Sequence, residues 1–383
     1  MHGKGICVEI TEYRKNAADM IALVRCAVSG ETPDAALTGQ LDLPKLFEVC
    51  QSHILTACAA YALESAGIRD AAFVEAKEKA IRKNILMDAE RAKVLDRLEQ
   101  EQIWYMPLKG AVLKDWYPRL GMRQMSDNDI LCDGAARQRI RTIMEDMGFT
   151  CAHFETGNDD AYYKPPVCNF EMHNELFSAG QSARLHQYYQ NVKARLLKEP
   201  GNAFGYRFSA SDFYIYLAAH EYQHYVTGGT GVRCLPDTLL VRRKLEGELD
   251  WDYIGRETER LGIREFEQTI RNLSDKVFAG DPLSAEEQKE LDYLVTSGIY
   301  GTKINEIANQ MKKSGGSGLR YWKNRLFPPL DWIRTYYPFF GRHRWLIPGL
   351  WVWRPLRAVF CRRNSVQKEL SELRKLKHTN RGN

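Results

Sequence analysis

The chain has 383 residues, which is enough for two or three domains with hydrophobic cores of ordinary size. Its hydrophobic (44%) and charged (27%) fractions are those of a soluble globular protein, and a net charge of +5 argues neither for nor against nucleic acid. Nine scattered cysteines without a Cys-x-x-Cys motif exclude a zinc ribbon and a thioredoxin-like site. Such cysteines fit a cytoplasmic protein. We expect no signal peptide and no transmembrane span, since no apolar run of about 18 residues occurs.

The first hundred residues are predicted to be helical. Hydrophobic spacing indicates helices over residues 16–28, 44–65 and 70–102, the second of them ending at Gly67. The third is rich in Ala, Glu, Lys, Arg and Leu, and we expect its charged face to be solvated. We assign residues 1–100 to an N-terminal helical region.

A mixed core follows. The pattern predicts a strand over residues 103–108 and a helix over 135–147 that ends at Gly148. Further strands are expected over 127–132, 149–154, 161–164 and 167–173. Strands around one helix fit a small mixed sheet, so we expect an α+β fold with its core in residues 101–177.

Helices return after the core. They are expected over residues 211–226, which open with Ser-Asp capping chemistry, and over 237–249 and 251–261. Ser284 opens a further helix with the spacing of a capping box. We assign residues 178–310 to a C-terminal helical domain.

Residues 311–383 form an extension of different composition. A Gly/Ser-rich joint over 312–318 precedes residues 320–360, in which tryptophans alternate with arginines. Three interpretations are open: a subdomain that covers the core, a peripheral membrane contact through residues 320–360, or stacking on single-stranded nucleic acid. We favour the first, with membrane association as the next.

The chemistry is concentrated in three acidic residues. In a strand, Asp127 and Asp129 would point to the same face, and Glu171 lies on another short strand. Carboxylates converging on one point suit Mg²⁺ or Mn²⁺, which bind carboxylates together with substrate phosphates. The structural alternative is that the two Asp side chains only cap a loop or turn. We predict that Asp127, Asp129 and Glu171 are catalytic metal ligands.

Other residues nearby are candidates for binding a nucleotide. Lys109-Gly110 follows a strand, as a phosphate-binding turn would, although Lys109 could also be a solvated lysine. Arg123 could clamp a phosphate or pair with a nearby acid. His173 shares a strand face with Glu171 and would orient a ligand or an acceptor, or be a structural histidine.

The ordered set of motifs resembles the family of uncharacterised nucleotidyltransferases, within the polymerase-β-like superfamily. The resemblance covers most of residues 40–275 and implies transfer of a nucleoside monophosphate from an NTP, with ATP expected, to an unidentified acceptor: a small molecule, a protein or RNA. It is carried by Pro107-Leu108-Lys109-Gly110, Tyr117-Pro118, Arg123, Ser126-Asp127-Asn128-Asp129, Glu171-Met172-His173, His220 to His224, Arg233 and Asp237.

One departure from the family pattern matters. Ala111 stands where the superfamily usually has Ser after the glycine, so a hydroxyl contact to phosphate is missing. Lys109 would compensate for it. Otherwise the protein is a catalytically silent nucleotide- or partner-binding protein, which is a second interpretation from a different class.

A third interpretation is a zinc metallopeptidase. His220-Glu221-Tyr222-Gln223-His224 is a His-Glu-x-x-His motif on an expected helix, with Glu246 or Glu248 as a third ligand. The family resemblance favours instead that this helix packs against the nucleotide cleft, where His220 and His224 contact base, ribose or acceptor. Arg233 and Asp237 are expected in the same wall as an ion pair.

Overall fold

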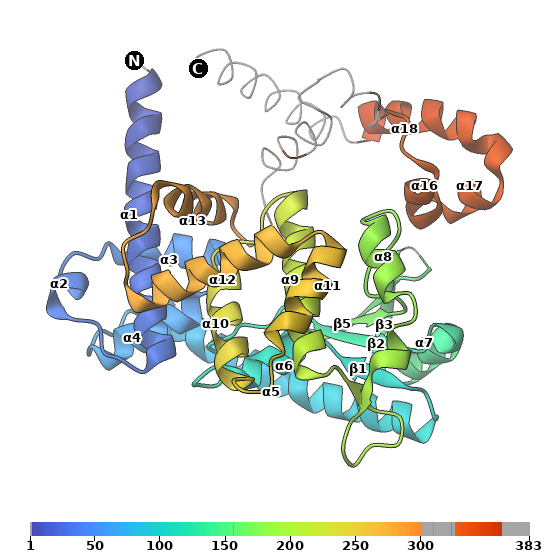
Figure 1. Ribbon diagram of the computed structural model, residues 1–383, viewed down its shortest axis with the longest axis horizontal. Helices are drawn as coiled ribbons and strands as arrows, with labels where there is room; N and C mark the ends of the chain where they lie inside the picture. The colour runs from blue at the N-terminus through green and yellow to red at the C-terminus, as the bar shows by residue number, and fades with distance from the viewer. Residues whose placement is uncertain (1, 156, 300–308, 310–322, 324–325, 362–383) are drawn as a thin grey trace.

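The computed structural model describes residues 2–155, 157–299, 309, 323 and 326–361. It is an α+β fold in which a five-stranded mixed sheet lies among helices from both ends of the chain, which confirms the predicted fold class. In Figure 1 the N-terminal helices lie at one end of the molecule and the sheet at the other. The assignment of residues to four domains stays a prediction.

The N-terminal region is helical, but residues 44–65 do not form one helix as predicted. They form α3 (Leu43–Ser52) and α4 (Thr56–Ser65), which pack on α1 (His2–Ser29). The chain turns between them at Ile54, whose φ of 55° lies in the left-handed region. A β-branched residue rarely takes this conformation, and no glycine or proline marks the break, so the sequence pattern missed it.

The predicted long helix is confirmed as α5 (Ala71–Gln100), which begins after its N-cap Asp70. The Asp70 carboxylate accepts hydrogen bonds from the backbone N–H groups of Ala72 and Phe73. These are two of the donors that a helix start leaves without partners. α5 runs along the sheet and thereby links the N-terminal helices to the core (Figure 1).

The sheet has the strand order β1-β2-β5-β4-β3. β2 and β5 are parallel, and all other neighbours are antiparallel. Each strand falls within or beside a predicted one: β1 (Tyr105–Pro107), β2 (Asn128–Cys132), β3 (Thr150–His153), β4 (Asp159–Lys164) and β5 (Cys168–His173).

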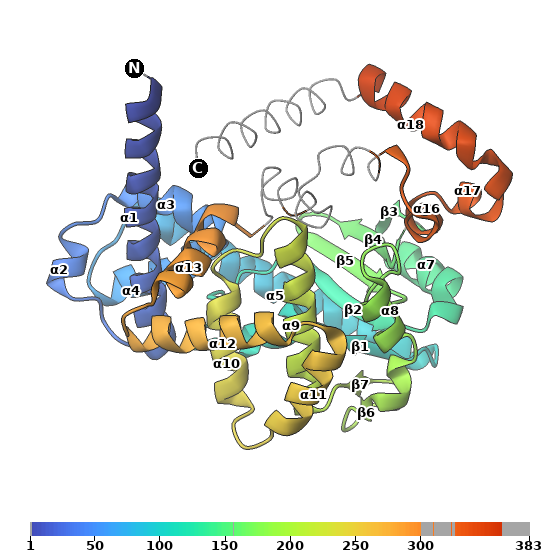
Figure 2. The ribbon, with the colours of Figure 1, turned by 45° about the horizontal axis from the view of Figure 1, so that its top comes forward.

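The two faces of the sheet differ. On one face Ile130, Phe170, Met172 and Tyr162 are buried against α5 and α7 (Arg137–Asp146). The opposite face carries Asp129, Glu171 and His173, because side chains alternate along each strand. Leu131, on the same face as Asp129, packs in one hydrophobic cluster with Phe213 and Ile215 of the C-terminal helices. The candidate site therefore lies between the sheet and those helices, whose arrangement is seen in Figure 2.

The C-terminal helices cover the polar face and extend to the N-terminal helices. α11 has the predicted bounds because Asp250 caps its start and Gly262, in the left-handed conformation, ends it. The capping box at Ser284 is confirmed as well. The elements are α8 (Ala183–Tyr189), β6 (Leu197–Lys198), β7 (Tyr206–Arg207), α9 (Ala210–Thr227), α10 (Cys234–Lys244), α11 (Trp251–Leu261), α12 (Arg264–Ala279) and α13 (Ala285–Ser297).

The C-terminal extension contains α16 (Leu330–Tyr336), α17 (Pro338–Arg342) and α18 (Ile347–Cys361). Prolines lie at helix starts here. Pro329 precedes α16, whereas Pro348 lies in the first turn of α18, where its missing N–H costs no hydrogen bond. The predicted joint over 312–318 lies outside the described residues. Within the described part of the chain, no helix is long and apolar enough to span a membrane.

Candidate active site

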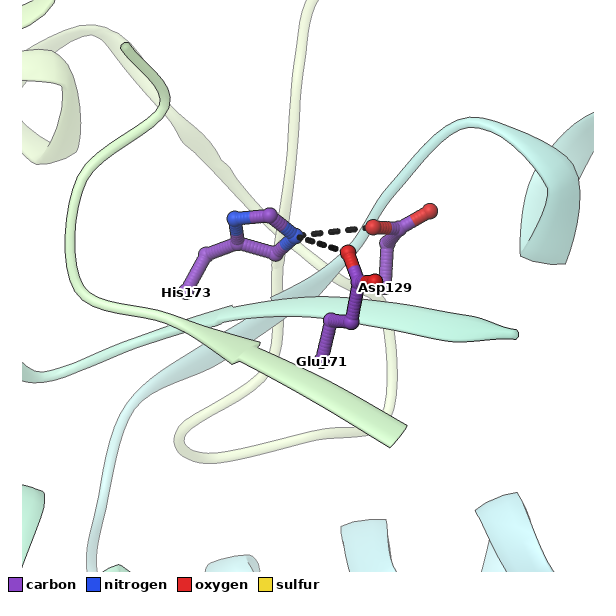
Figure 3. Close-up of side chains that lie close together, drawn as sticks. All are labelled: Asp129, Glu171 and His173. Carbon is purple, nitrogen blue, oxygen red and sulfur yellow. Dashed lines mark hydrogen bonds and ion pairs between the residues drawn. The ribbon is translucent and has the colours of Figure 1, made fainter. Parts of the chain in front are cut away.

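The centre of the candidate site is fixed by the register of two parallel strands. Asp129 on β2 lies beside Glu171 on β5, and His173 follows two residues later on the same face. His173 Nε2 lies 2.7 Å from Asp129 Oδ1 and 3.6 Å from Glu171 Oε2 (Figure 3). Ligand atoms of all three side chains lie within 4.8 Å of one another, so they could hold one metal ion.

Asp127 stands just before β2, two residues from Asp129, and lies beside this cluster rather than in it. Burial raises the pKa of the Asp127 carboxyl, and the negative charge of Asp129 raises it further. The charges of Lys109 and Arg233 act in the opposite direction. Asp127 therefore shares the electrostatic field of the three clustered side chains.

Lys109 supplies the positive charge at this acidic site. Its Nζ lies 3.1 Å from Asp129 Oδ1, so it is bound to an acid in the ligand-free protein rather than solvated. Burial disfavours the charged ammonium, but the nearby negative charges, with Asp129 the largest of them, together outweigh burial and raise the pKa of Lys109. The backbone of Lys109 has φ 40°, a conformation unusual for a residue with a side chain. This turn aims the lysine back at β2.

Gly110 begins the short helix α6 (Gly110–Leu113) directly after that turn. A Cβ atom at Gly110 would lie 2.6 Å from Nη1 of Arg123 and 2.8 Å from Sδ of Met125. A side chain cannot be accommodated unless these groups move. The glycine thus permits Arg123 to pack tightly against the turn.

Arg123 is held in a buried ion pair in the ligand-free protein, and the phosphate contact expected of it stays a prediction. Its Nε and Nη2 donate to Oδ1 and Oδ2 of Asp237 at 2.9 and 3.0 Å, and Tyr117 donates to Oδ1 at 2.8 Å. The predicted ion pair between Arg233 and Asp237 is therefore wrong, because Arg123 occupies both oxygens of the carboxylate. The buried pair joins the turn region to α10.

Helix α9 presents a row of three rings spaced four residues apart: Tyr216, His220 and His224. The Nε2 atoms of the two histidines lie 3.2 Å apart. Burial lowers the pKa of His220 to about 3, and the positive charge of Lys109 adds to this effect. Burial also lowers the pKa of His224. Both imidazoles are thus neutral near pH 7 and face the side of the site that carries Lys109.

A family model described as an uncharacterised nucleotidyltransferase matches residues 39–279. The chain belongs to this family. The match contains the whole of the site, from Lys109 to Asp237, and it gives the protein a general role in nucleotidyl transfer. No curated protein and no solved structure matches the chain.

The His-Glu-x-x-His motif of this nucleotidyltransferase lacks the rest of a zinc site. Among the described residues, no third carboxylate, thiol or imidazole joins His220 and His224 in a metal-binding cluster. Glu246 and Glu248, proposed as third ligands, are exposed residues after α10. Glu221 accepts a hydrogen bond from Thr230.

The pKa values of the acids in the candidate site are shifted in opposite directions. Burial raises the pKa of Glu171 to about 8, and the charges of Asp129, Asp127 and Asp159 contribute. Burial would likewise raise the pKa of Asp129, but Lys109 and the hydrogen bond from His173 hold it well below its usual value. A bound cation would reduce the repulsion between these neighbouring carboxylates, which is what a metal site requires.

Two residues of this site were not predicted. Tyr216 lies one helical turn before His220, so the spacing of four could have revealed it. Asp159 lies beside His173 only because β4 pairs with β5, and strand pairing is not evident from the sequence. Asn158, next to it, donates to Nδ1 of His173 at 3.5 Å, which leaves Nε2 to donate to Asp129.

Proposed function

We propose that this nucleotidyltransferase moves a nucleoside monophosphate from an NTP to an acceptor hydroxyl or phosphate and releases pyrophosphate. The observation that carries the proposal is the parallel register of Asp129 and Glu171, with Lys109 3.1 Å from Asp129. Two acids and one cation at one point are what a metal-bound triphosphate requires. Acyl transfer or redox chemistry would not need this combination.

The side chains present fit a divalent cation. Asp129, Glu171 and His173 would hold it, with Asp127 close by to hold a second ion or to orient the first. Carboxylates suit Mg²⁺, and an imidazole in the set suits Mn²⁺ as well. When bound, such an ion neutralises phosphate charge and lowers the pKa of an acceptor hydroxyl. The binding of a cation would displace the proton that His173 now shares with Asp129.

The chain's own residues supply positioning. Lys109 is free to exchange Asp129 for a phosphate oxygen once a cation satisfies the acid. The neutral imidazoles of His220 and His224 can each donate one hydrogen bond and accept another, as a base or ribose requires. Buried Tyr216 shields the site from water on the same side. Positioning and charge neutralisation are the main catalytic terms in phosphoryl and nucleotidyl transfer.

The proposal is tested by incubating the full-length protein with each α-³²P-labelled NTP and Mg²⁺ or Mn²⁺. Label is then scored on the protein itself, on RNA and on small molecules, so that the assay identifies the acceptor class as well. We expect cation-dependent transfer, fastest with ATP, and its loss in Asp129→Asn. Binding of NTP without any transfer to the three acceptor classes would favour a silent nucleotide-binding protein and contradict the proposal.

A further inference from the structure

Charge is distributed unequally along this chain. Residues 320–383 contain 15 lysines and arginines and only three acids, Asp331, Glu369 and Glu372, which gives this segment a net charge of +12. Because the whole chain carries +5, the first 319 residues carry a net charge of −7. Such an asymmetry indicates that the basic segment has an anionic partner of its own. The nucleotide site, which lies in the acidic part, does not account for it.

The described part of this segment folds around a small core of its own. Ile333 on α16 and Ile347 and Leu350 on α18 are buried together, and Trp332, Tyr337 and Trp351 pack against them. In both ribbon views α16 lies between α18 and the sheet, so α18 is at the periphery of the molecule (Figures 1 and 2). Its outer surface is therefore available to a partner.

That outer surface is apolar. The exposed residues over the first two turns of α18 are Pro348, Gly349, Val352 and Trp353. They are spaced four apart, so they form one stripe along the helix, and none of them is charged. Val352 is 63% exposed, and Trp353 is 44% exposed although its ring also contacts Tyr337. The opposite side of the helix supplies the small core.

Large apolar side chains and cations are also exposed in the residues just before α18. Phe339 on α17 is 59% exposed, and Trp345, just before α18, is 78% exposed. The exposed arginines Arg342 and Arg344 lie between them in the sequence. Aromatic rings with adjacent cations are typical of protein surfaces that sit at the boundary between lipid headgroups and acyl chains.

We propose that the surface formed by Phe339, Trp345, Val352 and Trp353, with Arg342 and Arg344, binds an anionic lipid bilayer. The exposed aliphatic residues decide between lipid and nucleic acid. Val352 and Pro348 have no aromatic ring on which a base could stack, whereas they gain free energy by entering the acyl region. The arginines meet anionic headgroups at the same depth. The inference does not depend on the proposed catalytic activity.

The test measures cosedimentation of the full-length protein with vesicles of phosphatidylcholine, alone or mixed with phosphatidylglycerol. We expect binding to the mixed vesicles that weakens with salt, because salt screens headgroup charge. Replacing both arginines, Arg342→Gln with Arg344→Gln, should weaken binding by about fivefold per arginine. Trp345→Ser with Val352→Ser should weaken vesicle binding at least about tenfold, since two apolar side chains can no longer enter the acyl region.

The matched control replaces two apolar residues exposed elsewhere, Leu120→Ser with Leu197→Ser, each 44% exposed. It should bind vesicles like the natural protein. A fluorescently labelled single-stranded oligonucleotide serves as the competing probe. Absence of vesicle binding, equal binding by all variants, or loss of oligonucleotide binding alone in the Trp345/Val352 variant would each overturn the proposal. The substituted residues are exposed and lie outside the small core. A change in vesicle binding therefore does not result from unfolding.

Discussion

Arg123 and Asp237 form a buried two-pronged ion pair although 114 residues separate them in the chain. Both side chains are almost fully buried, and Tyr117 donates a third hydrogen bond to the same carboxylate. The pair fixes the loop before β2 to α10, and so it fixes the face of the sheet that carries Asp129 and Glu171 relative to the C-terminal helices. In the ligand-free protein it is a structural link at the border of the candidate site.

Breaking this pair should destabilise the protein strongly. Asp237→Asn or Arg123→Gln leaves an uncompensated buried group and should lower the free energy of unfolding by about 3–5 kcal/mol, measured by urea denaturation. As a control, Arg82→Gln breaks an exposed pair with Glu78 and should cost less than about 1 kcal/mol. A stable Arg123→Gln protein that only loses NTP affinity would instead show that Arg123 binds phosphate.

Two glycines should respond to alanine in opposite directions. Gly110→Ala places a Cβ 2.6 Å from Arg123 Nη1, so the tight packing must open, and both stability and nucleotide turnover should fall. Gly255→Ala, within α11, meets nothing within 4 Å and should raise the free energy of unfolding by about 0.5–1 kcal/mol. Thermal unfolding of the two variants checks this contrast. Equal effects would mean that the turn does not need a glycine.

Cation binding should depend on pH through Glu171. In the metal-free protein the pKa of this carboxyl is raised to about 8, so below that pH a cation must displace its proton. The affinity for Mn²⁺ should rise by about tenfold per pH unit and level off above pH 8. Over the same range the metal-free protein should lose stability as pH rises, because the folded state holds the proton more tightly than the unfolded chain.

Calorimetric titration with Mn²⁺ at several pH values measures this linkage. Glu171→Gln should bind the ion more weakly and with little pH dependence, since the titrating carboxyl is gone. The same affinity well below and well above pH 8 in the natural protein would show that Glu171 is not a ligand.

The local parts of this fold are those that could be predicted from the sequence. α11 was predicted with its true bounds because Asp250 and Gly262 mark both ends chemically. The break at Ile54 was missed because no turn residue marks it, and tertiary packing imposes the left-handed backbone. Strand alternation and the Lys-Gly turn are local patterns, and they marked Asp129 and Lys109. Glu171 lies on another strand, and the resemblance to the family is what grouped it with them.

The nonlocal parts of the site could not be predicted in the same way. The partner of Asp237 was expected to be Arg233, four residues away, yet it is Arg123, which arrives from the loop before β2. Pairing between distant segments depends on how the helices pack on the sheet. No short sequence motif indicates this packing. The same reason hid Asp159, which lies opposite His173 only through the pairing of β4 with β5.

The central claim is that the acids of β2 and β5 hold the cation for nucleotidyl transfer. The most direct measurement compares Mg²⁺-dependent turnover of labelled NTP in the natural protein and in Asp127→Asn with Asp129→Asn. We expect turnover to fall at least about 100-fold. Thermal stability should fall as well, because Asp129→Asn removes the ion-pair partner of the buried Lys109 ammonium, so circular dichroism is used to check that the double variant is folded. Asp146→Asn, at the exposed end of α7, should change neither quantity. Unchanged turnover in the double variant would contradict the account.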